Sequence, residues 1–472
     1  MVIRIDLEGA VKSFWRQVLM RLHLADAVLS LWAYVMQEEF LNGVFEEHRG
    51  RSYEEVVTFP RLVELIADAL IQYEGSGRQS FVTARENDAT EGCVEAYYGK
   101  LRRIPVELSI GLLEAATLRL RAIQPATAPL IDVPESLQDF QMLLVDGKTL
   151  KKCAKRLRPA RGQAGALYGG KLLVAYEPAT GLAVSFAAAE DGETNDAKLM
   201  PELIPQTRQA TAGNTRLWVL DRQFCDLTQP ALLSQDGDHY LIRYHPKNTF
   251  TVDTERSPVV SVDAEGRTVT DTWGWLGAAK SKRRRYLRRV CLQRPGEEEI
   301  LVMTDLLDET IYPGVDLVAA YGHRWGIESI FQQVTEVFEL RSLIGSTARA
   351  TIFQGSFCLL LSNFLQVMRQ HIAASQQDPI PAASLSIEMI FRDVTRELIA
   401  LNELVKPAAV AALIPSRRSA SALDAHLHTL LSDPIRALWK KTTNRKRRRN
   451  ANAEKQSGAH TSIARLIAAT NH

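Results

Sequence analysis

Six short apolar runs between residues 140 and 304 constrain the fold of this chain more than any other feature of its sequence. Each run is bounded by turn residues and is shorter than a typical helix, so each predicts a β-strand. In chain order the runs are QMLLV, KLLVAY, LAVSF, RLWVL, HYLIRY and EEILVMT. Glu-Pro-Ala-Thr-Gly between the second and third runs predicts a hairpin, and NDAKLMPELI before the fourth predicts a short capped helix. The expected order is strand, hairpin, helix, strand.

Helical patterns flank these strands. Residues 1–125 contain stretches such as FPRLVELIADALI, and the segment IQPATAPLIDVPES then marks a boundary near residues 123–136. A second helical pattern begins after Pro313 and continues, with interruptions, to about residue 440. Its most apolar part, Phe353 to Met368, is interrupted by polar residues and falls short of the ~20 residues of a membrane span. We expect a buried helix there and no membrane partner.

Composition limits the class of protein. A length of 472 residues exceeds what one hydrophobic core usually fills, so several domains are expected. The net charge is only +2 on 57 basic and 55 acidic residues, so any affinity for nucleic acid must come from local clusters. The five scattered cysteines disfavour a disulfide framework and a zinc site, and Asp6 and Glu8 interrupt any export signal. These features predict a cytoplasmic protein.

Residues 246–296 are polar and lack a helical period, and we expect a β-rich insertion there. This stretch holds Trp273, Trp275 and a basic run, Lys280–Arg289, that includes Arg283, Arg284 and Arg285. A second basic run, Lys440–Arg449, begins a C-terminal tail. Both runs are dense enough to bind a phosphate backbone, and the alternative for each is a solvated surface or a disordered tail.

Two acidic residues end predicted strands. Asp146 follows the run LLV and Asp221 follows WVL. The carboxyl ends of strands are where ligands collect in open α/β sheets, although an Asp at such a position can also be a simple turn residue. Asp305 follows ILVM in the same way, and we assign it to an ordinary loop because Leu-Leu-Asp-Glu comes next.

A third acidic residue lies in the predicted helix YGHRWGIESIFQQVT. At about 100° per residue, one polar stripe of this helix contains Tyr321, Arg324, Glu328, Gln332 and Thr335. The apolar side contains Ile327, Ile330, Phe331, Val334, Val337 and Phe338 and should face the core. This geometry predicts that Glu328 lies beside the core and away from bulk water. Arg324 and Glu328, one turn apart, could also form an ordinary helical salt bridge.

The spacing Tyr321-x2-Arg324-x3-Glu328 resembles the signature Y-x2-R-x3-E-x6-K of bacterial insertion-sequence transposases with a DDE triad, the insertion-sequence-four family. The segments Asp146-Gly-Lys148-Thr and Asp221-Arg222-Gln-Phe are also similar to that family. One position departs from the signature, because Thr335 stands where the family has Lys. Arg341 is a candidate to replace the missing cation.

The resemblance implies an α/β fold with a ribonuclease-H-like catalytic core at residues 137–345, interrupted by the β-rich insertion at about 246–296. The distances along the chain agree with such a core, since 221 − 146 = 75 residues accommodate three strands and a helix. The other expected parts are a helical region that binds DNA ends at 1–125, a helical region at 346–440 and a basic tail at 441–472.

The resemblance also implies two-metal phosphoryl transfer, with Asp146, Asp221 and Glu328 as the catalytic ligands of Mg²⁺ or Mn²⁺. Asp146 would bridge both ions. The implied DNA contacts are Tyr321, Arg324, Lys148, Arg222, Gln332, Arg283, Arg284 and Arg285. Trp273 or Trp275 would stack on a base turned out of the duplex, and core packing is the alternative for either ring.

The implied partners are double-stranded DNA, as terminal inverted repeats and as target, and a second copy of the chain that pairs the two ends. The expected location is the bacterial cytoplasm, associated with the nucleoid. Two alternatives stay open. One is a domesticated or inactive derivative that binds DNA without cutting it, and the other is a metal-dependent nuclease of the same fold.

Overall fold

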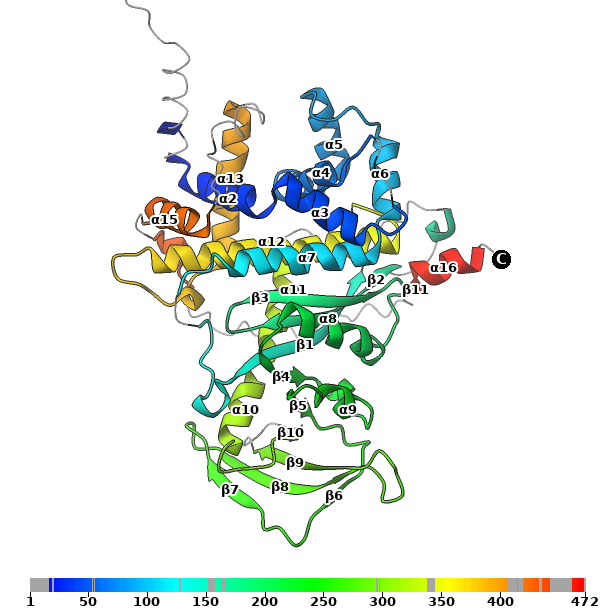
Figure 1. The fold of residues 1–472 in the computed structure, drawn as a ribbon, viewed down its shortest axis with the longest axis vertical. Coiled ribbons are helices and arrows are strands. Elements are labelled where there is room, and N and C mark those ends of the chain that lie inside the picture. The colour runs from blue at the N-terminus through cyan, green and yellow to red at the C-terminus, as the bar shows by residue number, and fades with distance from the viewer. Residues whose placement is uncertain are drawn as a thin grey trace, which may run out of the picture. The chain divides into compact units, whose positions relative to one another are not determined.

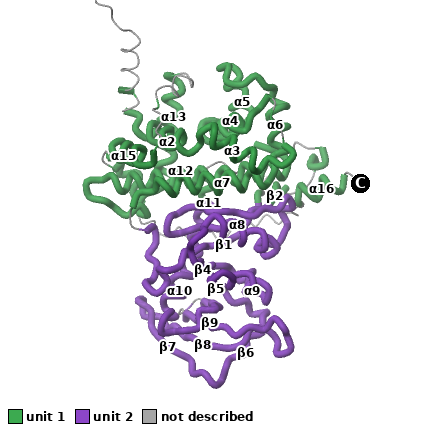
Figure 2. Tube along the Cα trace, viewed as in Figure 1, with its two compact units in different colours: residues 1–128, 150–170, 333–472 green, residues 129–149, 171–332 purple. Residues whose placement is uncertain are grey.

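A computed structural model describes residues 17–18, 21–52, 54, 56–126, 129–151, 158–162, 167–293, 296, 298–337, 344–405, 414, 419–432, 435–441 and 461–470. The chain divides into two compact units (Figure 2). Unit 1 consists of residues 1–128, 150–170 and 333–472, and unit 2 consists of residues 129–149 and 171–332.

Unit 2 is organised around one sheet. Its first five strands are β1 (Phe140–Lys151), β2 (Leu167–Glu177), β3 (Leu182–Ala189), β4 (Thr215–Leu220) and β5 (His239–Arg243). They lie in the order β3-β2-β1-β4-β5, with β3 antiparallel to β2 and with β1, β4 and β5 mutually parallel. The helix α8 (Met200–Ala210) connects β3 to β4, and α9 (Gln229–Leu233) connects β4 to β5. This order of strands and helices is the ribonuclease-H-like fold, which confirms the predicted fold class.

The β-rich insertion extends this same sheet. Its strands are β6 (Phe250–Val252), β7 (Val259–Val262), β8 (Thr268–Leu276) and β9 (Arg285–Leu292), followed by β10 (Ile300–Thr304). The sheet continues from β5 through β10, β9 and β8 to β6, with β7 also paired to β8, and every one of these pairs is antiparallel. The insertion therefore adds strands to the core sheet.

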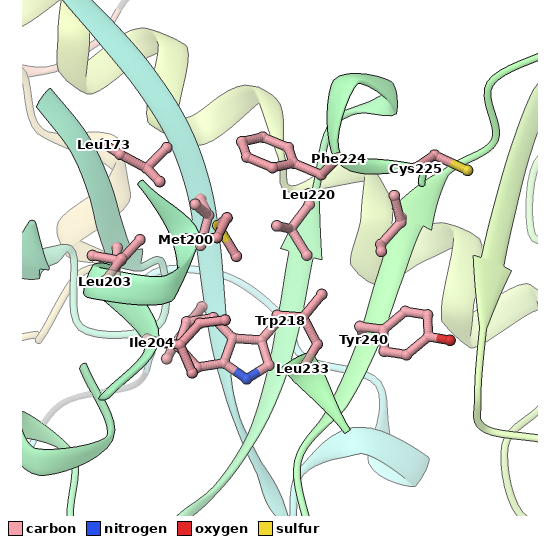
Figure 3. Packing of buried hydrophobic residues seen from close by; sticks show 14 of the residues in the cluster. Leu173, Met200, Leu203, Ile204, Trp218, Leu220, Phe224, Cys225, Leu233 and Tyr240 are labelled. Carbon is pink, nitrogen blue, oxygen red and sulfur yellow. The ribbon is translucent and has the colours of Figure 1, made fainter. Parts of the chain in front are cut away.

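The core of unit 2 lies between the sheet and α8 (Figure 3). Met200, Leu203 and Ile204 of α8 point at Trp218 and Leu220 of β4, and all five are buried. Alternate residues of a strand face opposite sides of the sheet, so Leu143 and Val145 of β1 join this core while Leu144 faces away from it. Leu144 is buried as well. Both faces of β1 are thus covered, as its unbroken apolar run predicts.

The predicted single helix after Pro313 is divided in two. The helix α10 (Gly314–Gly322) ends before Arg324, and α11 (Trp325–Glu336) follows. Between them, backbone amides at positions 323, 324, 326 and 327 donate to carbonyls three residues earlier. This tighter turn breaks the 3.6-residue period that the helical wheel assumed. Tyr321 therefore belongs to a different helix from Glu328, and the single stripe predicted from the sequence is wrong at its start.

Unit 1 is mainly helical, which agrees with the predicted helical flanks (Figure 1). Its helices are α2 (His23–Val35), α3 (Glu38–His48), α4 (Phe59–Ile71), α5 (Gly77–Glu86), α6 (Val94–Arg103), α7 (Val106–Arg121), α12 (Ala348–Ala374), α13 (Ile387–Leu404), α15 (Ala420–Leu430) and α16 (Ile463–Thr470). The short strand β11 (Thr461–Ser462) pairs with Leu167 and Tyr168 of β2.

The long helix α12 packs along α7. It is long and apolar enough to cross a membrane by length and composition, but its most apolar window is entirely buried within the protein. It is the core helix of unit 1, as predicted for Phe353 to Met368.

Short 3-10 helices complete the fold. They are η1 (Glu135–Leu137), η2 (Arg158–Ala160), η3 (Asp196–Lys198), η4 (Arg222–Phe224), η5 (Ala382–Ser384) and η6 (Ala437–Trp439).

Candidate active site

Asp146 and Asp221 lie side by side at the carboxyl edge of the sheet. The last paired residues of the parallel strands β1 and β4 are Val145 and Leu220, and each acid comes directly after one of them. Neighbouring strands are about 4.8 Å apart. Asp146 Oδ1 accepts the Gly147 amide at 2.8 Å, and Asp221 accepts the Arg222 amide at the start of η4. The strand register brings the two acids together, as predicted, but β1 continues to Lys151, so Asp146 lies within its strand and the prediction that it ends the strand is wrong.

Burial raises the pKa of Asp146 to about 6. The Gly147 amide and the Arg324 guanidinium oppose this rise, whereas the Asp196 and Asp221 carboxylates add to it. Asp146 therefore lies within electrostatic range of two other acids and one arginine. A partly buried carboxylate in such a group ionises at a cost, which a bound cation would reduce.

The helix α11 packs against β1. A Cβ added at Gly326 would lie 3.7 Å from Leu144 Cδ1, which is ordinary contact. Lys148 Nζ donates to the Phe331 carbonyl at 3.4 Å and lies 5.6 Å from the Phe331 ring centroid. These contacts place the first two turns of α11, which include Glu328, against β1 between Leu144 and Lys148.

Glu328 is bonded to Arg324. Arg324 Nη2 lies 3.0 Å from Glu328 Oε1, and the Glu328 side chain is 45% exposed. The prediction that Glu328 lies away from bulk water is wrong, because α11 turns Ile327, Ile330 and Val334 inward and the acid outward. The helical salt bridge that the spacing also allowed is present.

Tyr321 and Arg324 are both buried, at 3% and 4% exposure. Burial raises the pKa of Tyr321 to about 12, with Arg324 opposing this rise and Asp221 adding to it. Arg324 in turn interacts with Tyr321, Asp221 and Glu328. The two residues lie next to the acids, but neither presents a free surface to DNA in this structure.

The other residues predicted around the acids differ in exposure. Arg222 and Gln332 are exposed, and Lys148 and Thr335 are half-buried. Arg341, the candidate for the missing cation, lies outside the described residues. Arg222 and Gln332 thus lie at the protein surface.

The donor set fits a hard divalent cation. Asp146 and Asp221 offer carboxylate oxygens, which Mg²⁺ prefers, and burial, with a smaller contribution from Asp196 and Asp221, raises the pKa of Asp146. Among the described residues, no three His, Cys, Asp or Glu side chains are close enough to hold one ion. Within the described part of the chain, the neighbouring acids Asp146 and Asp221 are therefore the pair that could hold an ion.

Residues 138–364 match the protein-family model described as the transposase DDE domain. This segment contains Asp146, Asp221 and Glu328. No curated protein matches the chain. A solved structure of the piggyBac transposase synaptic complex with hairpin DNA aligns at 11% identity and a TM-score of 0.41, covering 87% of this chain and 86% of that one. A TM-score of that size carries no inference about this chain.

Asp196 lies inside the matched DDE segment, and the sequence analysis missed it. It is 5% exposed at the start of η3, in the connection between β3 and α8. Its only local sequence signal was the Asn-Asp pair before a helix, which predicted a cap, and Asn195 does cap η3. Trp325 was also not selected, yet its ring is 56% exposed and lies 4.4 Å from the Arg324 guanidinium.

The two tryptophans of the insertion differ in their exposure to solvent. Trp273 is fully buried, donates its Nε1 to the Leu307 carbonyl at 2.9 Å and lies under the Arg256 guanidinium. It is a core residue, so its assignment to base stacking is wrong. Trp275 is 39% exposed and packs against Tyr286 and Arg284. Only Trp275 is available to a base.

The basic run of the insertion is not one patch. Arg283 is exposed, Arg284 packs 4.6 Å from the Trp275 ring centroid, and Arg285 is half-buried at the start of β9. Arg288 is fully buried, pairs with Asp271 at 2.7 Å and donates to the Tyr312 carbonyl at 2.6 Å. The phosphate-binding assignment therefore fails for Arg288. In the second run, residues 442–449 lie outside the described part of the chain.

Asp305 lies at the opposite edge of the sheet. It follows β10, which is antiparallel to β5, so the carboxyl end of β10 is next to the amino end of β5. There Asp305 accepts hydrogen bonds from Ser234 Oγ at 2.7 Å and from the Tyr240 amide at 3.2 Å. This is the loop role that the sequence analysis assigned to it.

Proposed function

We propose that this chain is the DNA transposase of a bacterial insertion sequence, of the Y-R-E-K signature group. It would cut DNA at the element ends and join those ends to target DNA. The observation that carries the proposal is the pair Asp146 and Asp221, which the register of β1 and β4 places side by side within the segment matching the transposase DDE domain. Arg324 and Glu328 of the signature lie on the neighbouring α11 segment.

Asp146 and Asp221 would hold divalent metal, Mg²⁺ or Mn²⁺, with Glu328 completing the set. When bound, two such ions supply an activated water or 3′-hydroxyl and stabilise the leaving oxygen. The protein's own part is to keep the acids ionised and close together. Asp146 is ionised above pH about 6 because its pKa is raised to that value. Arg324 orients Glu328 through their hydrogen bond.

DNA contacts would come from the exposed residues Arg222, Gln332, Arg283 and Trp275. Cationic side chains bind phosphate, and an exposed aromatic ring can stack on an unpaired base. Lys148 is held against Phe331 and would support the acids from β1. Two copies of the chain would pair the two inverted-repeat ends.

The test is cleavage of end DNA in Mg²⁺ by Asp146→Ala, Asp221→Ala and Glu328→Ala. Each variant should lose cleavage and keep binding to end DNA, because these acids hold metal and not phosphate. Asp305→Asn is the matched control, since Asn keeps one of the two acceptor oxygens that Ser234 and Tyr240 use and lies at the opposite edge of the sheet, and it should cut normally. Near-normal cleavage by any one alanine variant would remove that residue from the catalytic set.

Thr335 favours a second candidate, an inactive derivative that binds DNA without cutting it. The signature has Lys at this position, and Thr brings no charge. A strand-transfer assay separates the candidates. A transposase joins a cut end to a new target, a nuclease of the same fold cuts without joining, and an inactive derivative does neither.

A further inference from the structure

The chain segments that carry Asp146 and Asp221 meet at one buried side chain, that of Asp196. Gln223, two residues after Asp221, donates its Nε2 to Asp196 Oδ2 at 2.7 Å. Gly147, next to Asp146, lies so close to Asp196 that an added Cβ would overlap all three atoms of the carboxyl group. Asp196 therefore contacts both segments at once.

Lys171 of β2 keeps Asp196 in place. Its Nζ lies 2.5 Å from Asp196 Oδ1, and the two side chains are 15% and 7% exposed. A buried carboxylate needs a partner charge and hydrogen bonds to be tolerated. Lys171 supplies the charge and Gln223 supplies a hydrogen bond, so Asp196 is anchored on the sheet and bonded to the loop after β4.

The distance between Asp146 and Asp221 must be held by contacts other than strand pairing. Pairing between β1 and β4 ends at Val145 and Leu220, so the strand ladder does not hold Asp146 and Asp221 together. Like charges this close repel each other, which favours separation of the two segments. The Gln223 hydrogen bond restrains one segment, and the close packing of Gly147 fixes the position of the other.

We propose that Asp196 is a positioning residue, and that the Asp196–Gln223 hydrogen bond sets the spacing at which Asp146 and Asp221 bind a divalent cation. This inference rests on the proposed function, because it assumes that the two acids act together on metal. Because Lys171 and Gln223 contact its two oxygens, we assign Asp196 a role through its neighbours and not as a ligand.

The test measures binding of Mn²⁺ alone to the folded full-length protein, by electron paramagnetic resonance, with thermal unfolding of the same samples. Gln223→Met has similar length but no donor. Partners that orient metal ligands typically contribute 10–100-fold to metal affinity, so we expect the Kd for Mn²⁺ to rise about tenfold or more. The Gln223 side chain is exposed, so the unfolding temperature should stay close to that of the wild type.

Gln223→Glu tests the role of Asp196 further. A carboxylate facing Asp196 is repelled, so this variant should bind Mn²⁺ more weakly than Gln223→Met. Tighter binding would mean that position 223 can itself supply a ligand, and it would overturn the positioning role. Gln235→Met, which changes another exposed glutamine of unit 2, is the matched control and should bind Mn²⁺ normally.

Asp146→Ala separates failure of this inference from failure of the proposed function. Loss of Mn²⁺ binding in Asp146→Ala with unchanged binding in Gln223→Met would reject the positioning role and leave the metal site standing. Unchanged Mn²⁺ binding in Asp146→Ala would reject the metal site itself.

Discussion

Arg324, in the turn just before α11, donates to Glu328 in the first turn of that helix, and the bond joins a buried cation to an acid that is 45% exposed. An ion pair on a solvated helix surface contributes little to stability. This one differs because the guanidinium is 4% exposed and also interacts with Asp221 and Tyr321. Arg324 thus links the helix that carries Glu328 to the strand end that carries Asp221.

Arg324→Ala should lower cleavage of end DNA about ten- to hundredfold, because a hydrogen bond to a charged group contributes about 1.5–3 kcal/mol. Binding of end DNA should change little, since the guanidinium is buried. Cleavage kinetics and gel-shift titrations measure the two effects. A parallel loss of binding would show that Arg324 touches phosphate, and aggregation would show that its role is confined to folding.

Thr335→Lys restores the signature cation two helical turns after Glu328. If this side of α11 faces DNA, cleavage activity should rise. The gain should shrink as salt is raised, because contacts to phosphate release counterions and are screened. Thr335→Gln, which adds length without charge, is the control. Lower activity of Thr335→Lys at every salt concentration would show that this side of the helix does not face DNA.

Asp146→Asn should make the metal-free protein more stable while abolishing its activity. Above pH about 6 the Asp146 carboxylate is ionised at a cost that burial and two nearby acids impose. Asn keeps an acceptor for the Gly147 amide without the charge. At pH 7.5 the unfolding temperature should rise by about 2–4 °C for each kcal/mol removed.

The stability gained by Asp146→Asn should be present at neutral pH and lost in acid. The ordinary pKa of Asp is 3.8, and that of folded Asp146 is about 6. As the pH falls between these values, folded Asp146 takes up a proton before the unfolded chain does, so the wild type regains stability. Thermal unfolding in EDTA should therefore show no gain near pH 4. An equal gain at pH 4 and pH 7.5 would contradict this origin.

Trp273→Ala should lower the stability of the protein, whereas Trp275→Ala should weaken its binding to DNA. Trp273 is fully buried, so its removal should lower the free energy of unfolding by about 3–5 kcal/mol in urea titrations. Trp275 is 39% exposed, and Trp275→Ala should leave stability nearly unchanged. It should weaken binding to DNA with an unpaired end base by the ~1–3 kcal/mol of one stacked base. Equal binding of paired and unpaired ends by the wild type would contradict the stacking role.

The pairing of Asp146 with Asp221 could be predicted because it needs only short-range information. An apolar run marks a strand, its last residue marks the edge, and parallel strands present their carboxyl ends at the same edge. The break before α11 could not be predicted, because a helical wheel assumes a continuous helix. That break separated Tyr321 from the stripe. Ile327 and Val334 face the core as the wheel predicted, but the wheel does not show what covers the polar side, and Glu328 on that side is exposed.

Asp196 was missed for another reason. Its partners Lys171 and Gln223 lie 25 and 27 residues away, since 196 − 171 = 25 and 223 − 196 = 27. No periodicity or motif joins positions at such separations, so only the folded sheet reveals the contact. The exposure of the two tryptophans was equally out of reach, because both lie on the same face of β8 and differ only in what covers them.

The ribbon formed by β8 and β9 has an exposed end and a buried end. Trp275 pairs with Tyr286 at the exposed end, and four residues earlier Asp271 lies against Gly314, the first residue of α10. At about 3.3 Å per residue, these ends are roughly 13 Å apart. Arg288 of β9 bonds both to Asp271 and to the chain that leads into α10. Strand pairing and the Arg288 bonds thus connect the exposed Trp275 to the start of α10. The sheet extension therefore has one end exposed to solvent at Trp275 and the other end packed on α10, the helix that precedes Glu328.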